Sequence, residues 1–261
     1  RPAGDAVDCY IAEIPPFIEG ELAKLYETLH SSLPFFKAFR SIEQANCYVA
    51  RREGHPNTVL LFTCRCRRVE VLNEMIEIDQ AEIARFAHYV FAAFAQADII
   101  SFKAVKTGLL RFAYPVQQHK SKDTYVVTLP ATAEQYTSSL GKSTRTGIRY
   151  QTNNIVRNYP SFSSTFFTNE NVDEKHVRRI IEFSEKKINA RGLTFSYDVE
   201  RIIALVRMCG FVNAVLIDGQ VCAGTINYRI GSRFFGEVTG YDPAFEKYGL
   251  GKLCLHYTIC E

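Results

Sequence analysis

Two glycines near the C-terminal end of the sequence have the type and spacing to hold an anion. Gly249 and Gly251 follow a run of predicted antiparallel strands and come directly before an apolar helix. Glycine lets the backbone approach a ligand closely, and a helix start has unpaired N–H groups and a partial positive charge. The pattern predicts either a phosphate or diphosphate site at this helix start or an ordinary turn that begins a helix.

Two better known phosphate sites do not fit the sequence. A dinucleotide-binding Rossmann unit needs parallel strands and a third glycine, and neither accompanies Gly249 and Gly251. The run Gly141-Lys142-Ser143 matches the end of a P-loop, but Tyr136 stands where the first glycine is required. We therefore exclude both motifs.

Glu237 precedes the glycine turn by twelve residues and lies in the strand predicted for residues 233–241. A carboxylate in a partly desolvated cleft has a raised pKa and can act as a general base. The alternative interpretation is a solvated charge on the strand surface. Tyr241 follows in the same strand, where it either donates a proton or simply packs, and packing is favoured.

A row of basic residues lies along one face of a predicted helix. Lys142, Arg145 and Arg149 are spaced i, i+3 and i+7. This row is a candidate for binding an anionic substrate. A solvated basic face is the favoured alternative.

Composition and charge indicate a globular protein. The chain has 261 residues, is 47% hydrophobic, and carries 31 basic and 28 acidic residues for a net charge of +3. So small a net charge gives no reason to expect a nucleic acid partner. The longest apolar run, Tyr89 to Ala95, is far shorter than the roughly 20 residues that span a bilayer. The oligomeric state stays open.

The cysteines and histidines favour structural roles. The eight cysteines lie mostly in apolar stretches of a chain that is large enough to fold without cross-links, which predicts reduced thiols in a cytoplasmic protein. Cys64 and Cys66 have no second Cys/His pair at a zinc-type interval, so no metal is predicted. His256 lies in an apolar helix and is expected to be buried.

Hydrophobic periodicity predicts the same order of elements in both halves: a strand, helices, several antiparallel strands and a helix. Strands are expected at 9–14, 46–51, 58–78 (as two strands or one), 98–105, 125–129, 162–167, 212–217, 221–230 and 233–241. Helices are expected at 17–31, 81–95, 131–158 (weakened by two glycines), 171–189, 198–209 and after Gly251. Asn171 with Glu174 predicts a capping box, and the polar segment 116–123 predicts the boundary between the halves.

The segment 211–261 resembles the core of the GNAT acyltransferase superfamily. That superfamily binds the diphosphate of acyl-CoA at a turn of the form Arg/Gln-x-x-Gly-x-Gly/Ala, which corresponds here to Glu246 through Gly251, with Glu246 in place of Arg or Gln. The runs TYVVTLP, SLGKSTRTGIRY and VTGYDPAFEKYGLG are more similar to the FemAB-like and CelD-like branch over residues 124–261.

This resemblance implies an α/β protein, with mixed sheets, made of tandem GNAT-like folds. Residues 1–118 would form a lobe without a cofactor motif, and residues 119–261 a lobe that binds acyl-CoA and ends before its last strands. It implies Glu237 and Tyr241 as catalytic residues, and the cofactor, foremost acetyl-CoA, would be bound by Val238, Thr239, Tyr248, Gly249, Leu250, Gly251 and Lys252.

The expected function is transfer of an acyl group to an amine of a small polar acceptor, which Lys142, Arg145 and Arg149 would bind. One alternative is a FemAB-type aminoacyl transferase that uses charged tRNA. The other is a non-catalytic GNAT-like module for protein contacts.

Overall fold

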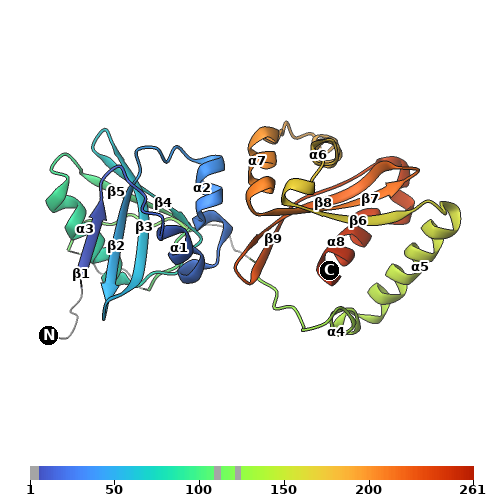
Figure 1. Ribbon diagram of the computed structural model, residues 1–261, viewed down its shortest axis with the longest axis horizontal. Helices are drawn as coiled ribbons and strands as arrows, with labels where there is room; N and C mark the ends of the chain where they lie inside the picture. The colour runs from blue at the N-terminus through green and yellow to red at the C-terminus, as the bar shows by residue number, and fades with distance from the viewer. Residues whose placement is uncertain (1–5, 109–112, 121–124) are drawn as a thin grey trace. The chain divides into compact units, whose positions relative to one another are not determined.

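The protein, described by a computed structural model over residues 6–108, 113–120 and 125–261, is divided into two compact units (Figure 1). The first unit comprises Arg1–Thr124 with Ile230–Arg233, and the second comprises Tyr125–Arg229 with Phe234–Glu261. Each unit combines a sheet with helices, which confirms the predicted mixed α/β class. The two lobes at 1–118 and 119–261 stay a prediction. The last part of the predicted boundary segment, residues 121–123, lies outside the described residues.

The first unit contains a five-stranded sheet in the order β1-β2-β3-β4-β5. Its strands are β1 (Ala6–Tyr10), β2 (Asn46–Arg52), β3 (His55–Arg65), β4 (Arg68–Glu74) and β5 (Ile99–Lys103). Neighbouring strands are antiparallel except β4 and β5, which pair in parallel. The parallel pair follows from the helix between them, because a crossover brings the chain back in the same direction.

Helices cover both faces of this sheet. They are α1 (Ile18–Tyr26), α2 (Leu33–Phe39) and α3 (Gln80–Ala93), with a short 3-10 helix at Leu29–Ser31. One buried cluster joins Ile18 of α1 and Phe36 of α2 to Leu61 of β3. Phe86 of α3 and Phe62 of β3 belong to a second cluster. Successive residues of β3 thus point into different clusters, as strand geometry requires.

The second unit contains a four-stranded sheet in the order β6-β7-β8-β9. The strands are β6 (Ser163–Thr168), β7 (Gly210–Ile217), β8 (Gln220–Ile230) and β9 (Arg233–Tyr241). The turn between β7 and β8 has positive φ at both Asp218 (50°) and Gly219 (73°). Two such residues form the type I′ turn that suits a hairpin, so the hairpin predicted at this dipeptide is confirmed.

Five α-helices and two short 3-10 helices are described in the second unit. They are α4 (Ala133–Ser139), α5 (Lys142–Asn158), η2 (Asn169–Asn171), α6 (Glu174–Asn189), α7 (Val199–Cys209), η3 (Pro243–Tyr248) and α8 (Leu250–Cys260). The pairs α6/α7 and α5/α8 lie on opposite sides of the sheet (Figure 1). Thr152 of α5 and Tyr257 of α8 are hydrogen-bonded through their hydroxyl oxygens, 3.1 Å apart.

Several predicted elements were wrong. Residues 125–129 form no strand, because no strand in the described part of the chain pairs with them, and Tyr125 is 92% exposed. The segment 17–31 is interrupted after Tyr26, since Glu27 has a left-handed φ of 44°. Helix α2 was not predicted, although Ser32 accepts a hydrogen bond from the Phe35 amide and starts it.

Helix starts in the second unit partly agree with the sequence pattern. Leu140 is extended and separates α4 from α5, which confirms the weakness predicted near Gly141. The capping box is wrong, because Asp173 and not Asn171 starts α6, with its carboxylate accepting from the Lys175 amide. Asp198 starts α7 as predicted.

The eight cysteines are free thiols; Cys47, Cys222 and Cys254 are buried and Cys66 is exposed. Among the described residues, no group of three or more His, Cys, Asp or Glu side chains is arranged to hold a metal ion. The described helices are all too short or too polar to cross a bilayer.

Candidate functional site

The glycine turn begins α8 in a left-handed conformation. Gly249 has φ 62° and ψ 36°, a region that glycine adopts without a steric penalty. Its carbonyl accepts from the amides of Lys252 (3.0 Å) and Leu253 (3.2 Å). The amides of Leu250 and Gly251 lie in the first turn of α8, where the helix has no carbonyl that could accept a hydrogen bond from them. They are therefore donors for an anion at this helix start.

A second reason for glycine at position 249 comes from α5. A Cβ at this position would lie 2.7 Å from Cδ of Gln151 and 2.9 Å from its Oε1, far inside contact distance. Oε1 of Gln151 is buried and has no hydrogen-bond partner within the described residues. The carboxamide of Gln151 thus packs on the bare backbone of the glycine turn.

Gly251 contacts the sheet instead. A Cβ there would lie 3.1 Å from Cδ1 of Tyr241 and 3.9 Å from Cγ2 of Thr239. Both side chains come from the end of β9, so this strand and the start of α8 are in direct contact. Lys187 of α6 places its ammonium 5.0 Å from the centre of the Tyr241 ring.

A buried polar network fixes α8 on the sheet. Asn213 of β7 donates through Nδ2 to the carbonyl of Cys254 (3.2 Å), and Thr225 of β8 is hydrogen-bonded to Thr258 (2.8 Å). Asn227 donates to Thr225 (2.9 Å). Buried hydrogen bonds of this kind specify a single position for the helix, and hence for the donors at its start.

Strand β9 contains one extra residue relative to β8. At one point Gly236 faces Asn227, since a Cβ on Gly236 would lie 3.6 Å from Oδ1 of Asn227. Further along, Gly224 and Gly240 both face Ile180 of α6. From Asn227 to Gly224 the chain advances by three residues along β8, whereas from Gly236 to Gly240 it advances by four along β9. The extra residue of β9 defines a β-bulge between residues 236 and 240. A bulge frees backbone groups from the ladder and redirects side chains.

Glu237 lies at this bulge. Its side chain is accessible to water, yet the protein atoms around it desolvate the carboxyl and raise its pKa. Accessibility together with desolvation is typical of a carboxyl group in a concave surface. Within the described residues Glu237 forms no salt bridge, so no neighbouring cation lowers its pKa.

The remaining residues predicted to bind the cofactor have different surroundings. Val238 is buried, whereas Lys252 is exposed beside the turn. Tyr248 is buried, and its hydroxyl accepts from Nδ2 of Asn158 at 3.0 Å. Its ring also packs against Tyr159. Tyr248 therefore supports the turn from inside.

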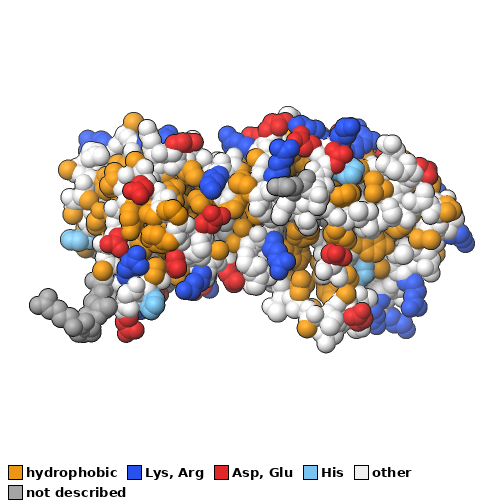
Figure 2. All heavy atoms as spheres, viewed as in Figure 1, with side chains coloured by type: hydrophobic (Ala, Val, Ile, Leu, Met, Phe, Trp, Pro, Cys, Tyr) orange, Lys and Arg blue, Asp and Glu red, His pale blue; other side chains and the backbone are white. Residues whose placement is uncertain are grey.

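The basic row lies elsewhere on α5. Figure 2 shows Lys and Arg side chains gathered over this helix, and Lys142, Arg145 and Arg149 are all exposed. The guanidinium of Arg145 donates to the carbonyls of Ser138 (2.7 Å) and Leu140, at the end of α4. Gln151 follows Arg149 by two residues, which places the two about 160° apart around the helix axis. The structure therefore does not bring the basic row together with Gly249.

His256 lies in the second half of α8, away from the glycine turn. It is half-buried rather than buried, and burial lowers its pKa. Its ring lies parallel to that of Tyr136 at 6.1 Å.

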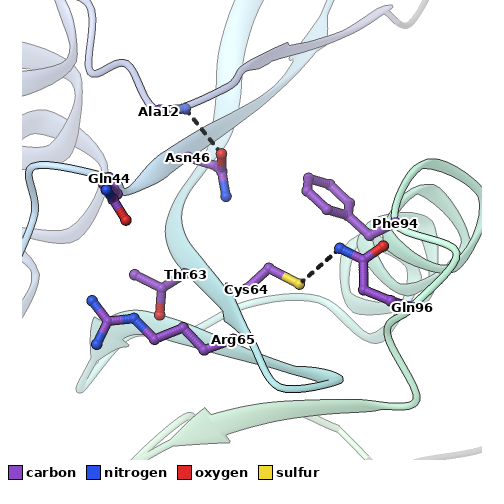
Figure 3. A pocket seen from close by; sticks show the side chains of 8 residues that line it. All are labelled: Ala12, Gln44, Asn46, Thr63, Cys64, Arg65, Phe94 and Gln96. Carbon is purple, nitrogen blue, oxygen red and sulfur yellow. Dashed lines mark hydrogen bonds between the residues drawn. The ribbon is translucent and has the colours of Figure 1, made fainter.

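Two cavities lie in the first unit, and neither contains a predicted site residue. One, of about 320 Å³, contains Cys64, to which Nε2 of Gln96 donates at 3.8 Å (Figure 3). The other, of about 180 Å³, lies at the start of α3 and is lined by Asp79 and by the buried Glu82. Acidic side chains at that helix start disfavour a phosphate there.

Sequence reasoning missed two residues of the second unit. Gln151 is an ordinary polar residue of a helix, and nothing in its neighbourhood along the chain points to Gly249. Tyr228 of β8 is buried, and its hydroxyl has no hydrogen-bond partner among the described residues. Its position within an apolar strand gives no sign of this in the sequence.

Comparison with known proteins supports the resemblance seen in the sequence. The family model described as acetyltransferase (GNAT) domain matches residues 142–261. The crystal structure of FemX is similar with a TM-score of 0.61 and 10% identity, over 97% of this chain and 85% of that chain. At this identity the likeness shows the fold alone, and it extends over both units. No curated protein matches the sequence closely.

Two further solved structures have TM-scores too low to carry an argument. A conserved protein of unknown function from Bacteroides thetaiotaomicron is 15% identical, with a TM-score of 0.34 over 49% of this chain and 45% of that chain. The chain thus matches less than half the length of that protein. A GCN5-related N-acetyltransferase-like protein from Streptococcus suis is 14% identical, with a TM-score of 0.20 over 92% of this chain and 84% of that chain.

The family match contains the whole segment from α5 to α8, including the bulge and the glycine turn. Residues 142–261 therefore match a GNAT-type acetyltransferase domain, which supports acyl transfer as the chemistry of this part of the chain.

Proposed function

We propose that the protein transfers an acyl group from acyl-CoA to an amine of a small polar acceptor. The observation that carries the proposal is the contact between the start of α8 and the end of β9. It combines anion-binding amides with a bulge and a desolvated carboxyl within one short segment of the second unit.

The residues present fit the diphosphate of acyl-CoA. The amides of Leu250 and Gly251 are available as donors, and Lys252 adds a positive charge beside them. Gln151 adds a carboxamide N–H group at the same turn. The exposed side chain of Glu246 replaces the usual Arg or Gln, so the backbone has to supply most of the affinity. When bound, acyl-CoA supplies the thioester that holds the acyl group.

The bulge of β9 supplies the remaining groups. Its backbone amides, at Val238 and Thr239, are candidates to donate to an oxygen that develops negative charge. Glu237 is the candidate base for the amine of the acceptor, because its raised pKa brings it closer to neutral pH. Tyr241 lies beside Gly251 and shapes the site by packing.

We place the cofactor in the second unit alone. Helix α3 of the first unit begins at Asp79 without a glycine turn, and Glu82 in its first turn is buried. A phosphate would meet two carboxylates there. The free thiols of the chain are consistent with a reducing compartment, and we propose a cytoplasmic location on that ground.

The second candidate function is aminoacyl transfer from charged tRNA. The fold likeness to FemX over nearly the whole chain favours it, in line with the FemAB-like motifs of the sequence. A net charge of +3 argues against it, because phosphate backbones bind through clusters of Lys and Arg.

Titration calorimetry separates these functions. We expect acetyl-CoA to bind the wild type and to bind Gly251→Val at least tenfold more weakly. Binding of charged tRNA without binding of acetyl-CoA would favour aminoacyl transfer. Binding of neither ligand would leave a GNAT-like module for protein contacts.

A further inference from the structure

The hydroxyl of Tyr228 is an unused polar group inside the second unit. The residue is 1% exposed, and its hydroxyl oxygen is buried without a hydrogen-bond partner in the described residues. Leaving such a group unpaired is costly, and nearly all buried polar groups in proteins have partners. A phenylalanine would fill the same space without this cost, so the hydroxyl needs an explanation.

Three titratable groups act on Tyr228, and two of them already have hydrogen-bond partners. Burial, then the Glu237 carboxylate, then Cys209 and Tyr197, raise the pKa of Tyr228. The Cys209 thiol donates to the carbonyl of Leu205 at 3.7 Å, and the Tyr197 hydroxyl is hydrogen-bonded to Ser184 at 3.3 Å. Among these titratable neighbours only Glu237 has no hydrogen-bond partner in the described part of the chain.

The geometry of the hairpin explains why these two groups meet. Strands β8 and β9 are adjacent and are joined by the two-residue turn Gly231-Ser232. This turn places Tyr228 opposite Phe235, two residues before Glu237. The bulge that begins after Gly236 breaks the alternation of side chains there. Glu237 follows Phe235 by two residues along β9, and its carboxylate raises the pKa of the Tyr228 hydroxyl.

We propose that Tyr228 is a positioning residue for Glu237, and that its hydroxyl donates to the Glu237 carboxylate whenever that carboxylate is ionised. This inference rests on the proposed acyl transfer, in which Glu237 accepts a proton. The two groups are not hydrogen-bonded in the structure, so the bond forms by a change of the Glu237 side-chain rotamer, which its accessibility allows. The donor stabilises the ionised base and fixes its direction toward the acceptor.

The test is Tyr228→Phe, followed by a pH titration of the Glu237 carboxyl carbon by NMR in the ligand-free protein. Loss of a donor to the charged form raises the pKa of that carboxyl, by about one unit for a hydrogen bond to an ionised group. The acidic limb of the kcat/KM profile then moves to higher pH by the same amount, with the KM for acyl-CoA unchanged. 3-Fluorotyrosine at position 228, a stronger donor, shifts both in the opposite direction.

Tyr48→Phe is the matched control. Tyr48 is also fully buried with an unpaired hydroxyl, but it belongs to the first unit. Its replacement reports the general effect of removing such a group, and we expect it to leave the Glu237 titration unchanged. Below the pKa of Glu237 the proposed bond is absent, so the melting temperature of both variants should be equal to or higher than that of the wild type. Above that pKa, Tyr228→Phe should lose the stabilisation of the ionised carboxylate, and Tyr48→Phe should not.

The readouts separate failure of this inference from failure of the proposed function. An unchanged Glu237 titration in Tyr228→Phe overturns the pairing, whatever the activity. If the Glu237 titration shifts in Tyr228→Phe but the wild type has no acyl transfer activity, the pairing of the two residues is supported and its role in catalysis is overturned. A fall in melting temperature for Tyr228→Phe but not for Tyr48→Phe that is equal below and above the pKa of Glu237 means that the hydroxyl has another partner, and this also overturns the proposal.

Discussion

The carboxamide of Gln151 lies where the Cβ of residue 249 would stand. Gly249 has a positive φ as well, so its backbone and its surroundings both require glycine. Here a side chain of α5 covers the same backbone, and the effects of substitution at this position combine folding with binding.

Gly249→Ala should destabilise the protein before it affects any ligand. The left-handed backbone costs an alanine roughly 1–3 kcal/mol, and the contact with Gln151 adds to that. In a Gln151→Ala background the same substitution should cost less, with a coupling energy of about 0.5 kcal/mol or more. Urea denaturation of the two single variants and the double variant measures this. Additive costs would mean that the two residues do not touch.

Gly251 is the better position for testing the anion site. A Cβ there is tight only against the ring of Tyr241, at 3.1 Å, and no positive φ opposes it. Gly251→Ala should therefore change the free energy of unfolding by no more than about 0.5 kcal/mol. Gly251→Val should weaken acetyl-CoA binding at least tenfold, about 1.4 kcal/mol, because its branched side chain screens the first amides of α8. Normal binding by a folded Gly251→Val would contradict the diphosphate assignment.

Glu237→Gln should lower turnover far more than it lowers acetyl-CoA affinity. The amide keeps the size of the side chain and removes its basicity, which typically contributes roughly 100-fold or more to the rate. The check is a kcat profile from pH 6 to 9 alongside calorimetry of acetyl-CoA. Equal turnover of the two proteins over this range would make Glu237 a surface residue of β9.

The same substitution should change how stability depends on pH. Desolvation raises the pKa of Glu237 in the folded protein, so the folded state holds this proton more tightly than the unfolded state does. The contribution of Glu237 to the stability of the wild type is therefore lost as pH rises from about 4.3, the ordinary glutamate value, through the folded pKa. Glu237→Gln lacks this loss. Its stability relative to the wild type should increase across that window and then stay constant, as followed by thermal unfolding.

Local patterns predicted the elements that local chemistry determines. The hairpin at Asp218-Gly219 follows from two residues that tolerate positive φ, and the start of α7 follows from the Asp198 carboxylate. Residues 125–129 have the composition of a strand, but a strand also needs a neighbour to pair with, and this information is not local. The bulge of β9 was missed for the same reason, since it is defined only by what Gly236 and Gly240 each face across the sheet.

Of the candidate site, the glycine turn and Glu237 could be identified from motif and chemistry. Gln151 could not, because it is 98 positions from Gly249 in the sequence and meets it only through the packing of α5. Tyr228 could not, because an unpaired hydroxyl is a property of its surroundings and not of its residue type.

The last prediction concerns the basic row of α5. Arg145 donates to two carbonyls at the end of α4, so Arg145→Glu should disturb the junction of α4 and α5 even if no ligand binds there. Arg149 is exposed, and Arg149→Glu tests acceptor binding more cleanly.

If the row binds an anionic acceptor, Arg149→Glu should raise the acceptor KM at low salt, and the defect should shrink at high salt, where the contact is screened. The acyl-CoA KM should not change, because Gln151 and Gly249 lie on the opposite flank of the helix.

A solvated face predicts unchanged kinetics and a stability change within about 0.5 kcal/mol, and we favour this outcome because Arg145 already has partners within the protein. Steady-state kinetics of the wild type, Arg149→Glu and Arg145→Glu at two salt concentrations decide between them. An increase in the acyl-CoA KM would instead place the basic row beside the cofactor and contradict the geometry described for α5.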